Sequence, residues 1–365
     1  MARPDDPQPL TWTRPSAPFD IVRPGHVELL VTDLGRARDF YEGQVGFVVT
    51  EETGGALYLR GYEDRHHHSL VLRKAERAAV AHIAFLVGSE DDLELGQRYY
   101  ESHGRPTRWV DEGVEAGQGR ALRVVDQLGF PIEYFSGMAR VENLLQRYDL
   151  QRGARLRRID HFNLHVPDVQ AAFDHYFGEL GFRCSEYIEG DPPDRTLYAA
   201  WLFRKPSTHD VALTGGAGPR LHHTAFWLGD VSGIVQLCDA LGGSGRQRSI
   251  ERGPGRHGVS NAFYLYLRDP DGHRIELFTD DYWTGDPDLQ PLRWSVHEER
   301  RRSFWGHQVA ERWYLESSEV VDLDGQPVQL VQPAIEEMKA AVLPTFCISA
   351  MTCSVRVVLP DDSGP

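Results

Sequence analysis

The sequence predicts an α+β fold in which four copies of one strand–helix module are paired into two domains. The first observation is a repeat. HVELLVTDLGRARDFYEGQVGF, starting at His26, aligns without a gap with HFNLHVPDVQAAFDHYFGELGF, starting at His161. The second observation is a weaker pair of copies, which start at His82 and His223. Self-similarity of this kind indicates that one supersecondary unit has been duplicated.

Each strong copy consists of a strand followed by an amphipathic helix. An aspartate precedes the helix in both copies, Asp33 and Asp168, and predicts an N-cap that accepts hydrogen bonds from first-turn N–H groups. In the second copy, Phe173, Phe177 and Leu180 recur at helical spacing and predict the buried face of the helix. A Gly-Phe pair closes both copies.

Matching hairpins close the two pairs of modules. VVDQLGFPIEYF ends at Phe135 and LRDPDGHRIELF ends at Phe278, and the DPDG segment suits a tight reversal. Two domains of two modules each are therefore predicted, the first with a vestigial or structural site and the second catalytic. The predicted boundaries are an N-terminal extension at 1–19, domains at 20–140 and 155–282, a linker at 141–154, and a C-terminal lid or extension at 283–365.

Composition excludes several classes of partner. The net charge of −15 leaves no basic surface to neutralise the phosphates of nucleic acid or anionic lipid. No run of about 18 apolar residues is present, and the N-terminus lacks the apolar segment of a secretory signal. A cytoplasmic protein that binds neither nucleic acid nor membrane is predicted. Its four cysteines form no CxxC pair and are expected to be reduced thiols.

The segment after Asp281, DYWTGDPDLQPLRWSVHEERRRSFWG, is rich in Trp, Arg and Gly. Because it completes no module, we expect it to cover part of the second domain. Beyond about residue 332 the sequence has little pattern to interpret.

Alternation on the module-opening strands of the second domain predicts which side chains share a face. In HFNLHV, His161, Asn163 and His165 lie on one face, and the apolar residues lie on the other. The polar face is expected to look into a cup. In HHTAFWL the same rule turns His223 into this cup and sends His222 to the opposite face.

Glu276 lies between two apolar residues on the final strand, which directs its carboxylate into the same cup as His161 and His223. Two imidazoles and one carboxylate leave three coordination positions open, as suits non-haem Fe(II) oxygenases, and Mn(II) is tolerated by similar ligand sets. The alternative is that both histidines are satisfied core residues and that Glu276 pairs with Arg274.

Longer strings resemble a known family. IDHFN, YAAW, THDVALTGG, GPRLHH, ERGPGRHGVSNAFYLY and DPDGHRIELFTDDYWTGDP are similar to the extradiol catechol dioxygenases of the vicinal oxygen chelate superfamily, most closely those that act on homoprotocatechuate (3,4-dihydroxyphenylacetate). The likeness covers roughly residues 20–325. It implies βαβββ modules paired into open-barrel domains of the glyoxalase-like fold. It also implies Fe(II) or Mn(II) as cofactor, O2 as co-substrate, a catechol with a carboxylate side chain as substrate, and a homo-oligomer, a tetramer.

The resemblance assigns roles position by position, with His161, His223 and Glu276 as the metal ligands. His209 would be the acid/base near the O2 site, which suits a histidine that titrates near neutrality. The remaining assigned residues lie around the substrate: Tyr266, His257, Asn163, Trp201, Arg252 and Arg302. Arginine favours a bidentate contact with a carboxylate. Ordinary packing is the alternative for Tyr266 and Trp201, and solvated surface charge is the alternative for the two arginines.

The positions of Tyr266 and Glu276 on either side of Asp271 predict that they are cross-strand neighbours.

The first domain repeats the ligand types, because His26, His82 and Glu133 align with the three candidate ligands of the second domain. A second metal there is a hypothesis. Arg123, however, is expected to face Glu133 across the first hairpin. Their ion pair would neutralise the carboxylate and leave a satisfied vestige of duplication.

Two other functions are compatible with such modules, since a fold does not determine a function. One is a glyoxalase-like metal-dependent isomerase or transferase, which turnover without O2 would favour. The other is a non-catalytic ligand-binding protein, which ligand binding that survives metal removal would favour. The function predicted is an extradiol dioxygenase that gives a muconic semialdehyde.

Overall fold

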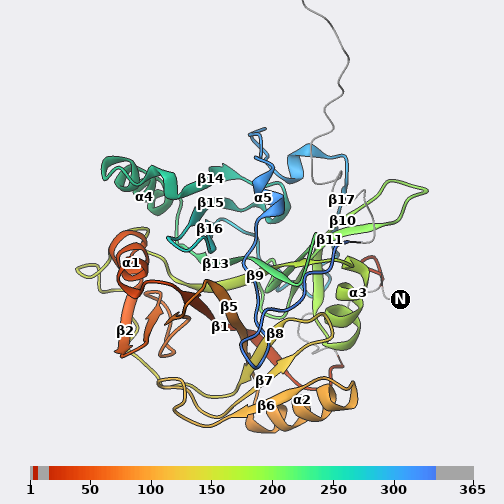
Figure 1. Cartoon of the computed structure of the whole chain (residues 1–365). Helices are drawn as coiled ribbons and strands as arrows, with labels where there is room; N and C mark the ends of the chain where they lie inside the picture. The colour runs from red at the N-terminus through yellow and green to blue at the C-terminus, as the bar shows by residue number, and fades with distance from the viewer. Residues whose placement is uncertain (1–2, 7–15, 334–365) are drawn as a thin grey trace, which may run out of the picture.

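The computed structural model describes residues 3–6 and 16–333, most of which belong to two mixed β-sheets and their helices (Figure 1). The first sheet has eight strands in the order β2-β3-β4-β1-β5-β8-β7-β6. Its strands are β1 (Ile21–Val31), β2 (Val48–Thr53), β3 (Ala56–Arg60), β4 (Leu70–Lys74), β5 (Ala79–Val87), β6 (Thr107–Val110), β7 (Ala121–Val125) and β8 (Pro131–Phe135).

The second sheet has nine strands in the order β14-β15-β16-β13-β9-β12-β11-β10-β17. Its strands are β9 (Arg158–Val166), β10 (Arg183–Glu189), β11 (Leu197–Phe203), β12 (Val211–Gly215), β13 (Arg220–Trp227), β14 (Ile250–Arg256), β15 (Phe263–Arg268), β16 (Arg274–Thr279) and β17 (Leu292–Ser295).

The same pairing pattern occurs in both sheets. β1 is parallel to β4 and antiparallel to β5, and β5 is parallel to β8. In the second sheet β9, β12, β13 and β16 pair in the corresponding way. With one helix after the first strand of each set, the chain contains four βαβββ modules. The predicted fold is therefore confirmed.

Helices α1 (Leu34–Arg38), α2 (Glu90–Ser102), α3 (Val169–Phe173) and α4 (Ser232–Gly243) follow the first strand of each module. The side chains of Asp33 and Asp168 accept hydrogen bonds from first-turn N–H groups, so both predicted N-caps are confirmed. The helices α1 and α3 continue as π-helical turns over Asp39–Val45 and Asp174–Glu179. The Phe173 and Phe177 rings are stacked, with centroids 4.8 Å apart.

One apolar core runs through both sheets. Phe85 of the first sheet packs edge-on against Phe162 of the second with ring centroids 5.6 Å apart, and Phe47 packs in the same way on Phe226 at 4.7 Å. Buried aromatic contacts of this kind are rigid, because protein interiors are close-packed. The second sheet, which carries the candidate site, is therefore packed rigidly against the first.

The segment after β16 crosses the second sheet instead of forming a further module. It adds β17 beside β10, the short helix α5 (Arg312–Leu315) and bridges from 318 and 320 to β13 and β5. In Figure 1 this blue segment descends from α5 past the middle of the molecule.

Among the described residues, no helix is long and apolar enough to cross a bilayer. Cys184 and Cys238 form no disulfide among the described residues, whereas Cys347 and Cys353 lie outside them.

Candidate metal centre and pocket

The second sheet surrounds a pocket, and the structure places all ten residues predicted from the sequence on its wall. These residues are His161, Asn163, Trp201, His209, His223, Arg252, His257, Tyr266, Glu276 and Arg302. Val296, Trp313 and Tyr314 of the segment after β16 also line it.

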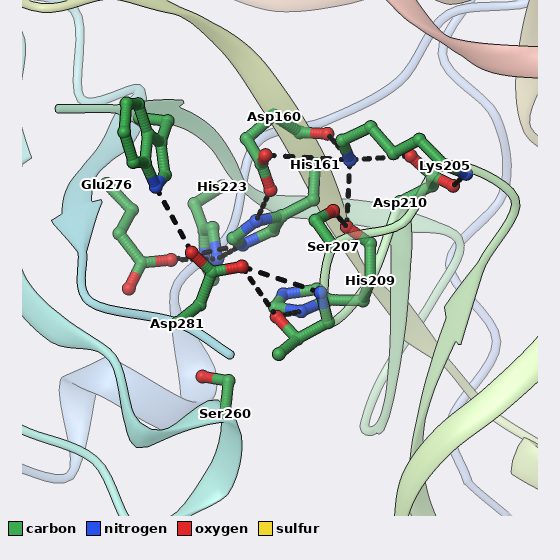
Figure 2. Close-up of polar contacts among 12 residues, drawn as sticks. Asp160, His161, Lys205, Ser207, His209, Asp210, His223, Ser260, Glu276 and Asp281 are labelled. Atoms are coloured by element: carbon green, nitrogen blue, oxygen red, sulfur yellow. Dashed lines mark hydrogen bonds and ion pairs between the residues drawn. The ribbon is translucent and has the colours of Figure 1, made fainter. Parts of the chain in front are cut away.

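His161, His223 and Glu276 converge from strands β9, β13 and β16 (Figure 2). Glu276 Oε2 lies 3.1 Å from His161 Nε2 and 3.0 Å from His223 Nε2, and the two Nε2 atoms are 3.4 Å apart. All three side chains are almost fully buried. Arg274 pairs with Glu251 at 2.6 Å, so the alternative that it neutralises Glu276 is wrong.

The hydrogen-bond partner of His161 determines which ring nitrogen carries hydrogen. Asp160 Oδ2 lies 3.0 Å from His161 Nδ1, and a carboxylate can only accept, so Nδ1–H donates. Burial acts to raise the pKa of Asp160, but Lys205 and His161 lower it overall, which keeps Asp160 ionised. In the neutral ring, His161 Nε2 therefore presents a lone pair toward Glu276.

A histidine pair determines the hydrogen position of His223 in the same way. His222 Nε2 lies 3.0 Å from the carbonyl oxygen of Trp313, which can only accept, so His222 Nδ1 is left as an acceptor. That atom lies 2.6 Å from His223 Nδ1, which must then donate. With both rings neutral, His223 Nε2 also presents a lone pair.

The prediction that His222 faces away from the pocket is wrong, because His222 lines it beside His223. The pairing of β13 with β9 has an irregularity between Leu221 and His223, and a bulge of this kind breaks strict side-chain alternation. The adjacent histidine therefore supports His223.

A divalent metal fits these three residues. Two lone pairs and one carboxylate oxygen face one another at 3.0–3.4 Å, with no hydrogen between them once both Nδ1 positions are fixed. Such acceptors repel one another unless a cation lies among them. Two imidazoles and one carboxylate match the facial set used by Fe(II) and related metals, and three protein ligands leave positions for other molecules.

His209 lies directly beside this group. Its ring centroid is 3.8 Å from that of His161, and Thr208 Oγ1 lies 3.0 Å from its Nδ1. Figure 2 shows the two rings beside each other, with Ser260 farther below. Burial first, and then the neighbouring His161, lowers the pKa of His209 well below its usual range, so the ring is neutral.

Tyr266 is paired with Glu276 across the hairpin, which confirms the predicted neighbourhood. Its hydroxyl lies 2.9 Å from His257 Nε2, and His257 Nδ1 lies 2.7 Å from the carbonyl oxygen of Arg302. The carbonyl makes Nδ1 the donor, so Nε2 accepts from the phenol. Burial and then Arg252 lower the pKa of His257 to about 3, which keeps this acceptor neutral.

Cationic side chains gather elsewhere on the pocket wall. Arg252 donates to the carbonyl oxygen of Arg302 at 2.6 Å, and its guanidinium lies 4.6 Å from the Trp313 ring. Arg301 was not predicted, yet it is buried and lines the pocket. The Nε atoms of Arg252 and Arg301 are buried without hydrogen-bond partners among the described residues, and neither guanidinium forms an ion pair there.

Asn163 lies on β9 and Trp201 lies on β11. Asn163 Oδ1 accepts a hydrogen bond from Thr214 Oγ1 at 3.1 Å, which fixes the orientation of the amide. Trp201 on β11 pairs with Glu186 and Ala212 through its backbone, and its half-buried side chain lines the pocket.

Comparisons with known proteins agree with this geometry. The model of the Glyoxalase/Bleomycin resistance protein/Dioxygenase superfamily matches residues 23–133 and 158–277. The chain belongs to this superfamily. Each match spans two of the four modules, and the resemblance stated from the sequence is confirmed.

The similar proteins are extradiol dioxygenases. A manganese-dependent 2,3-dihydroxybiphenyl 1,2-dioxygenase of Geobacillus genomosp. 3 is 32% identical over 78% of this chain and 94% of its own length. The structure of homoprotocatechuate 2,3-dioxygenase from Arthrobacter globiformis is 49% identical with a TM-score of 0.84, and the match covers 87% of this chain and 98% of that one.

The same enzyme from Brevibacterium fuscum, in complex with 3,4-dihydroxyphenylacetate, is 48% identical with a TM-score of 0.84 and coverages of 87% and 99%. The predicted enzyme class, extradiol dioxygenase, is confirmed. The predicted cofactor, Fe(II) or Mn(II), agrees with the manganese named for the Geobacillus relative and with the His-His-Glu group.

We predict that His222→Phe weakens metal binding by about 10–100-fold, the usual cost of losing a group that orients a metal-bound histidine. Phenylalanine keeps the ring packing but removes the acceptor that holds hydrogen on His223 Nδ1. Competition with a chromophoric chelator would measure the affinity for Mn(II). His165→Phe is the matched control, because His165 packs on His222 at 4.6 Å but hydrogen-bonds neither candidate ligand among the described residues. Equal affinities in the two variants would contradict the predicted role.

Proposed function

We propose that the chain opens the aromatic ring of 3,4-dihydroxyphenylacetate beside its diol and inserts both atoms of O2 to give a muconic semialdehyde. The observation that carries this proposal is one pocket lined both by the His161, His223 and Glu276 group and by Arg252 with Arg302. A substrate with a diol at one end and a carboxylate at the other has groups that complement both sets. The Brevibacterium fuscum relative, solved with this compound, supports the choice.

His161, His223 and Glu276 would hold Fe(II) or Mn(II). The bound metal would supply a Lewis-acid centre that takes both diol oxygens and passes electron density from the ring toward O2. Two nitrogens and one oxygen suit either metal.

Tyr266 and His257 form a path for a substrate proton. Because the phenol hydrogen points to His257 Nε2, the Tyr266 oxygen presents its lone pairs to other donors. A substrate hydroxyl could donate there while the phenol keeps its own hydrogen bond to His257, whose Nδ1–H stays on the Arg302 carbonyl. This chain of hydrogen bonds orients the diol hydroxyl and gives its proton a route toward His257.

His209 is placed to handle a proton on the O2 side. It lies against His161 and is held at Nδ1 by Thr208, so its ring position is fixed relative to the metal group. A neutral imidazole can accept a proton and return it later in the reaction.

The substrate carboxylate would bind Arg252 and Arg302. The unpartnered Nε of Arg252 supports this role, because a buried N–H without an acceptor is costly and a carboxylate supplies one. Asn163 and Trp201 would then contact the ring and its diol. Homotetrameric assembly and a cytoplasmic location remain predictions from the sequence.

Aerobic incubation of Fe(II)-loaded or Mn(II)-loaded protein with a panel of catechols tests the function. We expect consumption of one O2 per substrate, the yellow colour of a ring-opened semialdehyde, and the highest kcat/KM with 3,4-dihydroxyphenylacetate. A product formed without O2 would support the isomerase or transferase alternative instead. Substrate binding that survives metal removal without turnover would support the ligand-binding alternative.

Replacement of Arg252 by Met tests the carboxylate site. We expect KM for 3,4-dihydroxyphenylacetate to rise about 10–100-fold, the value of a lost charge-assisted hydrogen bond of roughly 1.5–3 kcal/mol. The KM for 4-methylcatechol, which has no carboxylate, should change much less, and this substrate serves as the internal control. An equal loss with both substrates would show that Arg252 acts on the pocket as a whole.

A further inference from the structure

A second group of buried ligand-type side chains lies in the first sheet. His26 Nε2 is 3.1 Å from His82 Nε2 and 3.4 Å from both Glu115 Oε2 and Glu133 Oε1. His82 Nε2 is 3.5 Å from Glu115 Oε1 and 3.7 Å from Glu133 Oε1. All four residues are almost fully buried, and their donor atoms all lie within 4.8 Å of one another.

Strand pairing places three of these residues as it places the candidate ligands of the second sheet. Ala84 on β5 pairs with His26 on β1 and with Glu133 on β8, and His82 lies two residues before Ala84. Glu115 is different, because it comes from the loop between β6 and β7 and has no counterpart that the repeat alignment predicted. Glu115 adds a second carboxylate to the two histidines and one glutamate that the repeat shares with the second sheet.

The predicted pair of Arg123 and Glu133 is present, with Arg123 Nε 2.6 Å from Glu133 Oε2. Arg123 Nη2 also contacts Glu115 Oε1, so one guanidinium serves two buried carboxylates. With neutral imidazoles, this leaves a net buried charge of −1. Arg123 alone therefore balances one of the two carboxylates, and the predicted Arg123–Glu133 pair is part of a larger group that also includes Glu115. Gln118 also donates to Glu133 Oε1 at 2.7 Å.

Two buried atoms are directed into the group without a hydrogen-bond partner, Glu115 Oε2 and His68 Nε2, which lie 3.6 Å apart. His67 Nε2 is 3.1 Å from Glu51, a carboxylate, so in the neutral ring its Nδ1 accepts. His68 Nδ1, 3.1 Å away, must then donate, which leaves its Nε2 as a lone pair facing Glu115. Two buried acceptors that face each other are stabilised by a cation close to them.

The number of acceptors distinguishes a metal ion from a proton. A proton on His26 Nε2 gives one N–H for three acceptors, His82 Nε2, Glu115 Oε2 and Glu133 Oε1. A divalent ion contacts four donors at once. Donors bonded at about 2.0–2.2 Å in a tetrahedron lie roughly 3.3–3.6 Å apart, close to the 3.1–3.7 Å separations among His26 Nε2, His82 Nε2 and Glu133 Oε1. Glu115 approaches His26 with Oε2 at 3.4 Å and His82 with Oε1 at 3.5 Å.

We propose that the first domain binds a second divalent transition-metal ion through His26, His82, Glu115 and Glu133. Four protein ligands close the coordination sphere, which is the character of a structural metal site and not of a catalytic one. Arg123 and Gln118 orient the two carboxylates from outside. A pocket lined by His82 and Arg123 lies beside the group.

Metal stoichiometry tests this site without depending on activity. The full-length protein, stripped with a chelator and dialysed against Zn(II), should contain two equivalents per chain by mass spectrometry. His82→Ala and His223→Ala should each contain one, and the double variant should contain none. Glu115→Gln, which preserves size, should also lose one equivalent and covers the case in which His82→Ala does not fold. The exposed His103→Ala is the matched control and should keep two.

One equivalent in the wild-type protein, unchanged by His82→Ala, would overturn the proposal and assign a proton to the group. Two equivalents that neither His82→Ala nor Glu115→Gln reduces would equally overturn it, since the extra ion would then lie elsewhere. The number of metal equivalents per chain is measured without any ring-cleaving reaction. A result that overturns the second metal site is therefore distinct from one that overturns the proposed function.

Discussion

The candidate catalytic centre depends on one constraint of strand pairing, the position of β13 between β9 and β16. Ala225 on β13 is paired with His161 on one side and with Glu276 on the other. Because alanine carries only a methyl group, it leaves room above the sheet into which the flanking imidazole and carboxylate can turn. His223, two residues earlier on the same face, completes the set. Register therefore brings together groups that are far apart in the sequence.

The two sheets show how one geometry can lead to different sites. In the second sheet Tyr266 is paired with Glu276, whereas in the first sheet Arg123 is paired with Glu133. A neutral phenol does not form an ion pair with Glu276 as a guanidinium would. The carboxylate therefore stays available to a metal, and the pocket stays open for a substrate. In the first sheet the Arg123 guanidinium forms ion pairs with both Glu133 and Glu115. The first group is therefore enclosed by its own side chains, while the second opens to a large pocket.

Much of the site could be predicted from regular patterns. Period-two alternation placed His161 and Asn163 correctly, and symmetry about a tight turn placed Tyr266 opposite Glu276. The errors and omissions occur where the pattern is interrupted. A bulge turns His222 toward the pocket, Glu115 comes from the loop between β6 and β7, and Arg301 ends a three-residue 3-10 helix that is too short to show a periodic pattern. His209 and Trp201 were found through family resemblance, because their spacing alone carries no signal.

The most direct test of the account is a crystal structure of the Mn(II)-loaded protein grown without O2 and soaked with 3,4-dihydroxyphenylacetate. The account predicts an ion bound by His161 Nε2, His223 Nε2 and Glu276, with both diol oxygens on that ion and the carboxylate beside Arg252. Anomalous density away from these three side chains, or a substrate held elsewhere in the pocket with its diol off the metal, would contradict it.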